Sequence, residues 1–171
     1  MNEIINGFYE ELLMPMGERQ REGKDVFMDL ADPTARSAED LDKLFDLIKV
    51  ITPAVRITLG LNKNEATKVR KHMGLKEDES GKCNLMEYGE AIRSGLGVYQ
   101  VVIHTHDFIV GCRKEQTERI VNQHVDRPVR STGAGDHFNA GFCAGMLEGK
   151  SLRECMVSGQ AVAYQHVKGG R

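Results

Sequence analysis

The stretch STGAGDHFNAGF, residues 131–142, places three glycines and one aspartate where an extended segment turns into a helix. The residues before it, RPVR, contain a proline, and Asp136 falls in the first turn of the predicted helix. Consecutive backbone N–H groups at such a helix start can converge on an anion, because the positive end of the helix dipole lies there. Gly133, Ala134 and Gly135 are therefore a candidate anion hole for a transferred phosphoryl group.

Asp136 has two explanations that the residues alone leave open. An acidic side chain in the first turn stabilises a helix through its dipole, by a few tenths to about 1 kcal/mol. The same carboxylate, next to an anion hole, is placed to take a proton from an attacking hydroxyl group.

A dinucleotide-binding loop is excluded at one position of this stretch. The fingerprint G-x-G-x-x-G, started at Gly133, requires its third glycine at the position of Phe138. This position therefore argues against the third alternative, a dinucleotide-dependent oxidoreductase.

The neighbouring segment AGMLEGKS, residues 144–151, fits a relaxed P-loop pattern. A working P-loop follows a strand, whereas this segment continues the apolar helical pattern that includes Phe142. Gly149 suits a helix C-terminus, and Ser151 with Glu154 forms a capping box that opens another helix. We therefore interpret 144–151 as a junction between two helices.

Strand and helix patterns alternate along the rest of the chain. The alternation predicts one α/β domain over residues 1–171, with a mostly parallel sheet, helices on both faces, and ligands where loops leave the carboxyl ends of the strands. Gly141 and Gly145 predict a close approach of their helix to the sheet. The predicted strands are 24–32, 55–61, 98–112 (one long strand or two short ones) and 117–125; the predicted helices are 4–13, 37–48, 64–73, 84–93, 135–148 and 151–167; and 76–82 is a predicted loop.

Composition limits the partners and the compartment. The 171 residues carry a formal net charge of −2, and nucleic acids and anionic membranes attract clustered positive charge, so neither is expected as a partner. No apolar run approaches the roughly 20 residues that span a bilayer, and the N-terminus is acidic where a signal peptide is basic, so we expect a cytoplasmic protein. The four cysteines form no C-x-x-C pair, so we expect reduced thiols.

The segment STGAGDHFNAGFCAGMLEGKS closely resembles the C-terminal signature of the ribokinase-like (PfkB) carbohydrate kinases. In that signature GAGD is followed by a phenylalanine two residues on and a G-F pair, here Phe138 and Gly141-Phe142. In the family the glycine loop is the anion hole for the transferring phosphate, and its aspartate is the catalytic base. The resemblance implies these roles for Gly133, Ala134, Gly135 and Asp136, and it implies a three-layer, Rossmann-like fold.

Two further segments are similar to parts of the same family. LGLNKNEATKV, residues 59–69, looks like its N-x-x-E segment, which implies that Asn62 and Glu65 organise Mg²⁺ and phosphates, largely through water. SGQAVAYQHVKGG, residues 158–170, is similar to the final helix, where Gln160 stands in place of the usual asparagine near the adenine of ATP. Thr132 is expected to contact the nucleotide as well.

His104 and His106 form an H-x-H pattern in the predicted strand 98–112. Alternate residues of a strand point to the same face, and this spacing is compatible with metal binding. Because no third ligand follows at convincing spacing, we predict no directly coordinated metal, and expect both imidazoles at the rim of a polar pocket near the nucleotide.

The sequence departs from the family pattern at two places. Arg130 occupies the position of a commonly acidic residue associated with a monovalent cation, which puts potassium dependence in doubt. HTHDFIVG, residues 104–111, replaces a T-x-G-like turn that contacts the nucleotide, so the contacts there must differ.

The matches cover nearly the whole chain but correspond only to the C-terminal half of a family member, a partial domain. The leading hypothesis is an ATP-dependent phosphotransferase that phosphorylates a sugar hydroxyl, with ATP and Mg²⁺ as cofactors. The alternative is a nucleotide-binding module without catalytic activity, because the family's N-terminal half supplies most sugar contacts. An exposed sheet edge and apolar surface would favour a homodimer.

Overall fold

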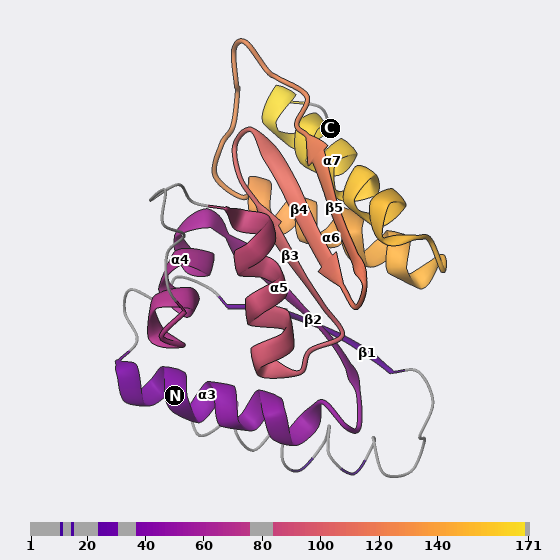
Figure 1. Cartoon of the computed structure of the whole chain (residues 1–171). Coiled ribbons are helices and arrows are strands. Elements are labelled where there is room, and N and C mark those ends of the chain that lie inside the picture. Colours follow the sequence, from indigo (N-terminus) through magenta and orange to yellow (C-terminus); the bar gives the residue numbers. More distant parts are fainter. Residues whose placement is uncertain (1–10, 12–14, 16–23, 31–36, 76–83, 170–171) are drawn as a thin grey trace.

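A five-stranded sheet in the order β1-β2-β3-β4-β5 forms the centre of the molecule (Figure 1). The computed structural model describes residues 11, 15, 24–30, 37–75 and 84–169. The strands are β1 (Asp25–Asp29), β2 (Arg56–Asn62), β3 (Gln100–His104), β4 (Phe108–Arg113) and β5 (Gln116–Val121).

Four of the five strands run in the same direction. β1 pairs with β2 and β2 with β3 in parallel, and the hairpins β3–β4 and β4–β5 are antiparallel, so β5 runs along β3 and only β4 is reversed. The stretch predicted as one long strand or two short ones is thus two strands, joined at residues 105–107. The mostly parallel sheet is confirmed.

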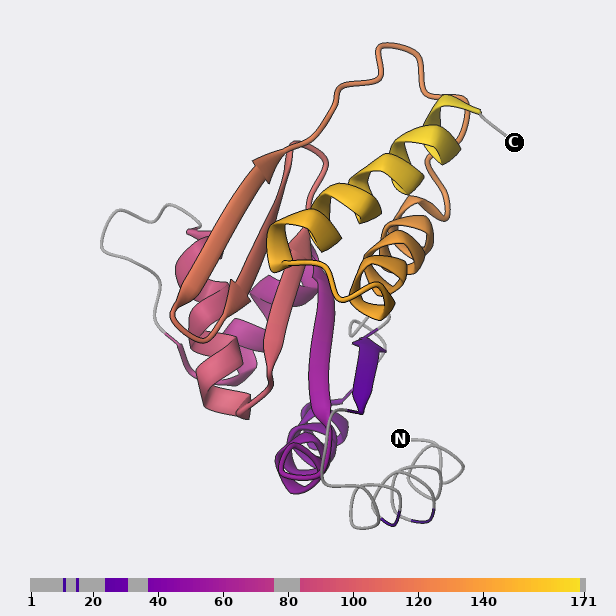
Figure 2. The same ribbon diagram turned by 90° about the vertical axis from the view of Figure 1, so that its right-hand side faces the viewer.

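Helices cover both faces of this sheet, which confirms the predicted layers (Figure 2). On one face lie α3 (Ala38–Ile51), α4 (Lys63–His72) and α5 (Leu85–Leu96); on the other lie α6 (Ala134–Leu147) and α7 (Leu152–Lys168). Strand side chains alternate between the two layers, as a period of two residues requires. Val101 and Ile103 join the core beneath α3–α5, whereas Val102 joins the core beneath α6 and α7.

Local hydrogen bonds explain why the last two helices are separate. Gly149 follows α6 with a φ of 70°, in the left-handed region that ends a helix. The hydroxyl of Ser151 accepts from the backbone N–H of Glu154, whose carboxylate accepts from the N–H of Ser151 at 2.9 Å. The predicted helix junction at 144–151 is confirmed.

The glycines of α6 face a neighbour other than the predicted one. A Cβ on Gly141 would lie 2.6 Å from the carbonyl oxygen of Ser158 in α7, and a Cβ on Gly145 would lie 3.0 Å from the Cα of Cys155. The expectation that these glycines allow a close approach to the sheet was wrong. They let α6 pack against α7, and Phe138 and Phe142 provide the apolar contact with the strands.

Some predictions lie outside the described residues: the N-terminal helix 4–13, the loop 76–82 and the state of Cys83. Cys112, Cys143 and Cys155 are free thiols. Across the described ranges, no helix is both long enough and apolar enough to cross a bilayer.

Substitution Gly141→Ala tests the contact between α6 and α7. Overpacking against rigid backbone costs about 1–3 kcal/mol, and alanine returns up to about 1 kcal/mol of helix propensity. We therefore expect a net loss of roughly 1–2 kcal/mol in the free energy of unfolding, measured by urea denaturation.

Gly95→Ala in α5 is the matched control, because its new Cβ would meet only the terminal methyl group of the flexible Met73 side chain. This variant should unfold at the same urea concentration as the parent chain or at a higher one. Equal destabilisation by both variants would contradict the assignment of Gly141 to a tight helix contact.

Candidate active site

The carboxyl ends of three adjacent strands bring polar side chains to one edge of the sheet. Asp29 is the last residue of β1, Asn62 of β2 and His104 of β3, and Asn62 pairs directly with His104 in the parallel register. The start of α6 faces this edge, and a pocket of ≈ 410 Å³ lies between them. We call it the polar pocket; its lining residues are Asp29, Asn62, Glu65, His104, Gly133, Gly135 and Asp136.

The glycine loop presents unpaired N–H groups at this pocket. Gly133 is the N-cap of α6, with a φ of 83° that only glycine adopts readily and no side-chain capping bond. Ala134 N–H donates to the carbonyl oxygen of Ser131 at 3.3 Å. Within the described part of the chain, the N–H groups of Gly133, Gly135 and Asp136 have no protein acceptor. These three N–H groups can therefore donate to an anion, whereas the N–H of Ala134 already donates to Ser131.

Gly135 lies where the loop approaches the His104 side chain of β3. A Cβ at this position would lie 3.2 Å from Cε1 of His104, tighter than an ordinary contact. The absence of a side chain therefore lets the start of α6 sit directly against the end of β3.

Asp136 lies in the first turn of α6 and its side chain is exposed at the polar pocket. Among the described residues, no hydrogen bond or ion pair engages its carboxylate. A carboxylate next to three free N–H groups combines a proton acceptor with donors for negative charge. The position is compatible with both explanations drawn from the sequence, dipole stabilisation and general base.

Asn62 and Glu65 form a capping box at the start of α4, which the sequence reasoning missed. The Asn62 side-chain oxygen accepts from Glu65 N–H at 2.9 Å, and the Glu65 carboxylate accepts from Asn62 N–H at 2.7 Å. The N-x-x-E spacing, like that of Ser151 and Glu154, was the available signal. Glu65 is only 5% exposed. Its carboxylate lies at the wall of the polar pocket and is held there by the hydrogen bond from Asn62 N–H.

The His104 ring packs against Phe138, an apolar residue near the start of α6. The centroids of the two rings lie 5.4 Å apart. Burial lowers the pKa of His104, and the nearby carboxylates Asp29 and Asp136 oppose that shift. Desolvation prevails, so the imidazole is neutral in the folded protein at neutral pH and can offer one N–H donor.

The expectation that His106 lies on a strand, on the same face as His104, was wrong. β3 ends at His104, and the Thr105 hydroxyl accepts from the N–H groups of Asp107 at 3.1 Å and Phe108 at 3.0 Å to form a turn. His106 therefore lies in that turn rather than on a strand, and it is largely exposed. The alternation argument does not apply to it. In the described ranges, no three His, Cys, Asp or Glu side chains form a group that could hold a metal ion.

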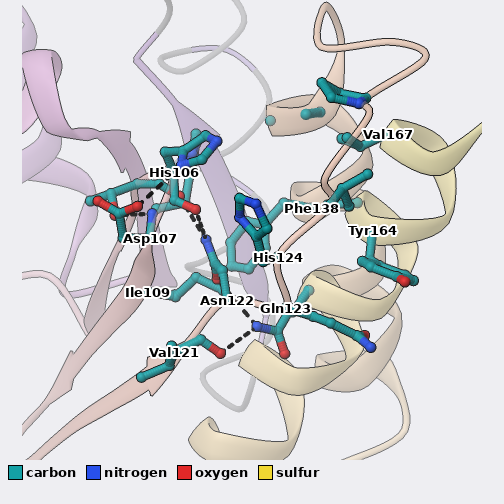
Figure 3. A pocket seen from close by; sticks show the side chains of 18 residues that line it. His106, Asp107, Ile109, Val121, Asn122, Gln123, His124, Phe138, Tyr164 and Val167 are labelled. Atoms are coloured by element: carbon teal, nitrogen blue, oxygen red, sulfur yellow. Dashed lines mark hydrogen bonds and ion pairs between the residues drawn. The ribbon is translucent and has the colours of Figure 1, made fainter.

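A second pocket of ≈ 390 Å³ adjoins the first, and His104 and Gly135 line both. We call it the apolar pocket. Figure 3 shows Phe138, Tyr164 and Val167 on one side and His106, Asn122 and His124 on the other. Its other lining residues are Thr105, Asp107, Ile109, Val121, Gln123, Val125, Pro128, Ala134, Gln160 and Ala163.

Gln160 supports the wall of the apolar pocket. Its amide nitrogen donates to the carbonyl oxygen of Val121 at 2.7 Å and to the side-chain oxygen of Asn122 at 3.2 Å. Asn122 in turn donates to the carbonyl oxygens of Thr105 and His106, at 2.8 and 3.0 Å (Figure 3). Thr132 lines neither pocket.

The sequence reasoning did not identify Asp29, Asn122 or Asn139 as site residues. The Asn139 amide donates to the Asp29 carboxylate at 2.6 Å and ties α6 to the end of β1. The predicted strand 24–32 runs past Asp29, whereas β1 ends there, so the predicted strand end did not point to this residue. Its partner lies 110 positions along the chain, and no local pattern indicates that pairing.

Comparison with known proteins places this chain in a family. The model of the prokaryotic ketohexokinase family matches residues 1–171. A protein named ketohexokinase from Haloferax volcanii is 27% identical over 161 residues, which are 94% of this chain and 38% of that protein.

Solved structures support the fold. An adenosine kinase from Schistosoma mansoni matches with a TM-score of 0.71 and 19% identity, over 95% of this chain and 47% of that one. A ribokinase from Thermotoga maritima matches with a TM-score of 0.64 and 23% identity, over 94% and 47%. The chain thus spans less than half the length of these proteins. It has the ribokinase-like fold and belongs to the prokaryotic ketohexokinase family.

Proposed function

We propose that this chain provides the ATP-binding and phosphoryl-transfer site of a sugar kinase. The observation that carries the proposal is the Asp136 carboxylate in the same helical turn as the N–H groups of Gly133 and Gly135, none of which has a hydrogen-bond partner among the described residues. A general base and donors for negative charge are two of the protein contributions to the transfer of a phosphoryl group to a hydroxyl.

The two adjoining pockets suit the two ends of a nucleotide. The apolar pocket, walled by Phe138 and Tyr164, offers surfaces for a flat base, and the polar pocket offers N–H donors for phosphates. Since His104 and Gly135 line both pockets, a nucleotide with its base in the first would extend its phosphates into the second. The neutral His104 imidazole would then supply a further donor near the phosphates.

The oxygen atoms of the polar pocket fit Mg²⁺. Asp29, Asn62 and Glu65 provide the carboxylate and amide oxygens that this hard cation prefers. Asn62 and Glu65 already bind each other's backbone, so their remaining lone pairs would reach the ion through water. Bound there, Mg²⁺ would neutralise phosphate charge.

In the proposed reaction, Asp136 accepts the proton of a sugar hydroxyl as the hydroxyl oxygen bonds to the terminal phosphorus of ATP. The bond from that phosphorus to the bridging oxygen breaks, and ADP leaves. The N–H groups of Gly133, Gly135 and Asp136 stabilise the charge on the transferred group. Because the family and the Haloferax relative are named for ketohexokinase, a ketohexose is the first acceptor to test.

Nucleotide binding without transfer is the second candidate. It is favoured by the coverage of the relatives, since the chain spans 38% of the Haloferax protein and 47% of the two solved kinases. The two candidates share the ATP site and differ only in whether this chain turns over a sugar.

Substitution Asp136→Asn separates the roles of this residue. Removing a general base costs about 10²–10⁴-fold in turnover. We expect that loss in coupled ADP release with a ketohexose, with little change in Mg·ATP affinity measured by calorimetry. Asp46→Asn, at a 78% exposed side chain of α3, is the matched control and should keep full activity.

The parent chain decides between the two candidates in the same assay. Mg·ATP binding with no turnover on a panel of sugars supports the nucleotide-binding module. Absence of Mg·ATP binding contradicts both, and normal turnover in Asp136→Asn removes the assignment of the base.

Substitution Glu65→Gln tests the cation site without breaking the helix cap. Glutamine retains an oxygen that can accept from Asn62 N–H, but it lacks the charge. We expect affinity for ATP to fall by about tenfold at limiting Mg²⁺, as for other groups that orient a metal through a second layer. The measurement is calorimetric titration of ATP at stepped Mg²⁺ concentrations.

Glu154→Gln is the matched control, because Glu154 occupies the same capping position in α7, away from both pockets. Both variants should unfold alike. A Glu65→Gln protein whose response to Mg²⁺ equals that of Glu154→Gln would rule out a role for the Glu65 charge.

A further inference from the structure

Two histidines stack on each other next to the glycine loop, and both contact its backbone. The rings of His137, in the first turn of α6, and His166, in the last turn of α7, lie 3.7 Å apart between centroids at an angle of 20°. Neither residue lines the polar pocket or the apolar pocket. They lie instead where the first turn of α6 meets the last turn of α7.

Each imidazole binds one carbonyl group of the loop. His137 Nδ1 lies 2.8 Å from the carbonyl oxygen of Gly133, and His166 Nε2 lies 2.8 Å from that of Thr132. A carbonyl oxygen only accepts hydrogen bonds, so both ring nitrogens carry the proton in these contacts. The pair therefore holds two successive peptide units of the loop.

The orientation of the donors follows from these bonds. In a planar trans peptide the N–H points opposite to the C=O of the same unit. When His166 holds the Thr132 carbonyl on the α7 side, the N–H of Gly133 is directed to the opposite side of that peptide unit. Gly133 lines the polar pocket, and its N–H has no acceptor among the described residues.

The loop has little other support of its own. Gly133 provides no capping side chain and has the widest conformational freedom of any residue type. Within the loop, Ala134 N–H donates to the Ser131 carbonyl oxygen at 3.3 Å. Before the loop, the Val167 carbonyl at the end of α7 accepts from Val129 N–H at 2.9 Å and from Arg130 N–H at 3.3 Å. The Gly133 carbonyl also accepts from His137 N–H, at 3.0 Å.

We propose that His137 and His166 are positioning residues that hold the peptide units of the anion hole and thereby set its affinity for the phosphates of the nucleotide. The proposal rests on the proposed function for its ligand. It assigns the shape of the loop to a contact between two helices rather than to the loop sequence.

Paired variants separate the hydrogen bonds from the stacking. His166→Phe and His137→Phe keep a ring for stacking and lose the N–H donor, whereas His166→Gln and His137→Asn place an amide donor near the original nitrogen. We expect each phenylalanine variant to weaken Mg·ATP binding by about tenfold, the effect of one lost hydrogen bond, and each amide variant to recover most of it. Binding of adenosine, which has no phosphates, should change little.

His72→Phe is the control, because His72 pairs with Asp42 at 2.7 Å on the α3–α4 side of the sheet. It should bind Mg·ATP like the parent chain. Parent-like Mg·ATP affinity in the phenylalanine variants would overturn the proposal, as would equal losses for adenosine and Mg·ATP or no recovery in the amide variants.

Nitrogen NMR on the ligand-free chain tests positioning without any nucleotide. We expect protons on Nδ1 of His137 and Nε2 of His166, and an amide resonance of Gly133 that moves in His166→Phe and returns in His166→Gln. An unmoved resonance would overturn the positioning role. If the parent chain binds no Mg·ATP, the proposed function fails, and this measurement still decides whether the histidines hold the loop.

Discussion

Parallel pairing of β1, β2 and β3 is the constraint on which the site depends. Parallel strands end at the same edge of a sheet, so Asp29, Asn62 and His104 meet there although crossover helices separate them in the sequence. The start of α6 needs only to face that edge to complete the polar pocket. A Cβ at Gly135 would lie only 3.2 Å from Cε1 of His104, which shows how closely it does so.

The position of α6 depends on its contact with α7. Glycines in both helices allow backbone to approach backbone: a Cβ on Gly141 would lie 2.6 Å from the carbonyl oxygen of Ser158, and a Cβ on Gly159 would lie 2.8 Å from that of Phe138. The same pair of helices carries the two histidines behind the loop and the aromatic wall of the apolar pocket. The packing of α6 against α7 thus affects both the stability of the fold and the geometry of the site, because a displacement at one end of a rigid helix also moves its other end.

Several polar groups serve structure and site together. Asn62 and Glu65 cap α4 and line the polar pocket, and Asn139 fixes Asp29 from the face of α6. Such bonds restrict side-chain freedom before any ligand binds, which lowers the entropy that binding must otherwise remove. The polar edge of the sheet is therefore organised by its own hydrogen bonds.

The sequence by itself determined features that depend on residues close together along the chain: the turn at Gly133, the helix whose first turn contains Asp136, the junction at Gly149, and the alternation that predicts layered helices and strands. A family resemblance also implied site roles for Asn62, Glu65 and Gln160, and these residues line the two pockets. Only the tertiary structure decided which helix the α6 glycines face, where β3 ends before His106, and that Asp29 meets Asn139 and His137 meets His166. The physical reason is distance along the chain: these contacts join segments whose approach depends on the packing of the whole sheet, and no local periodicity records them.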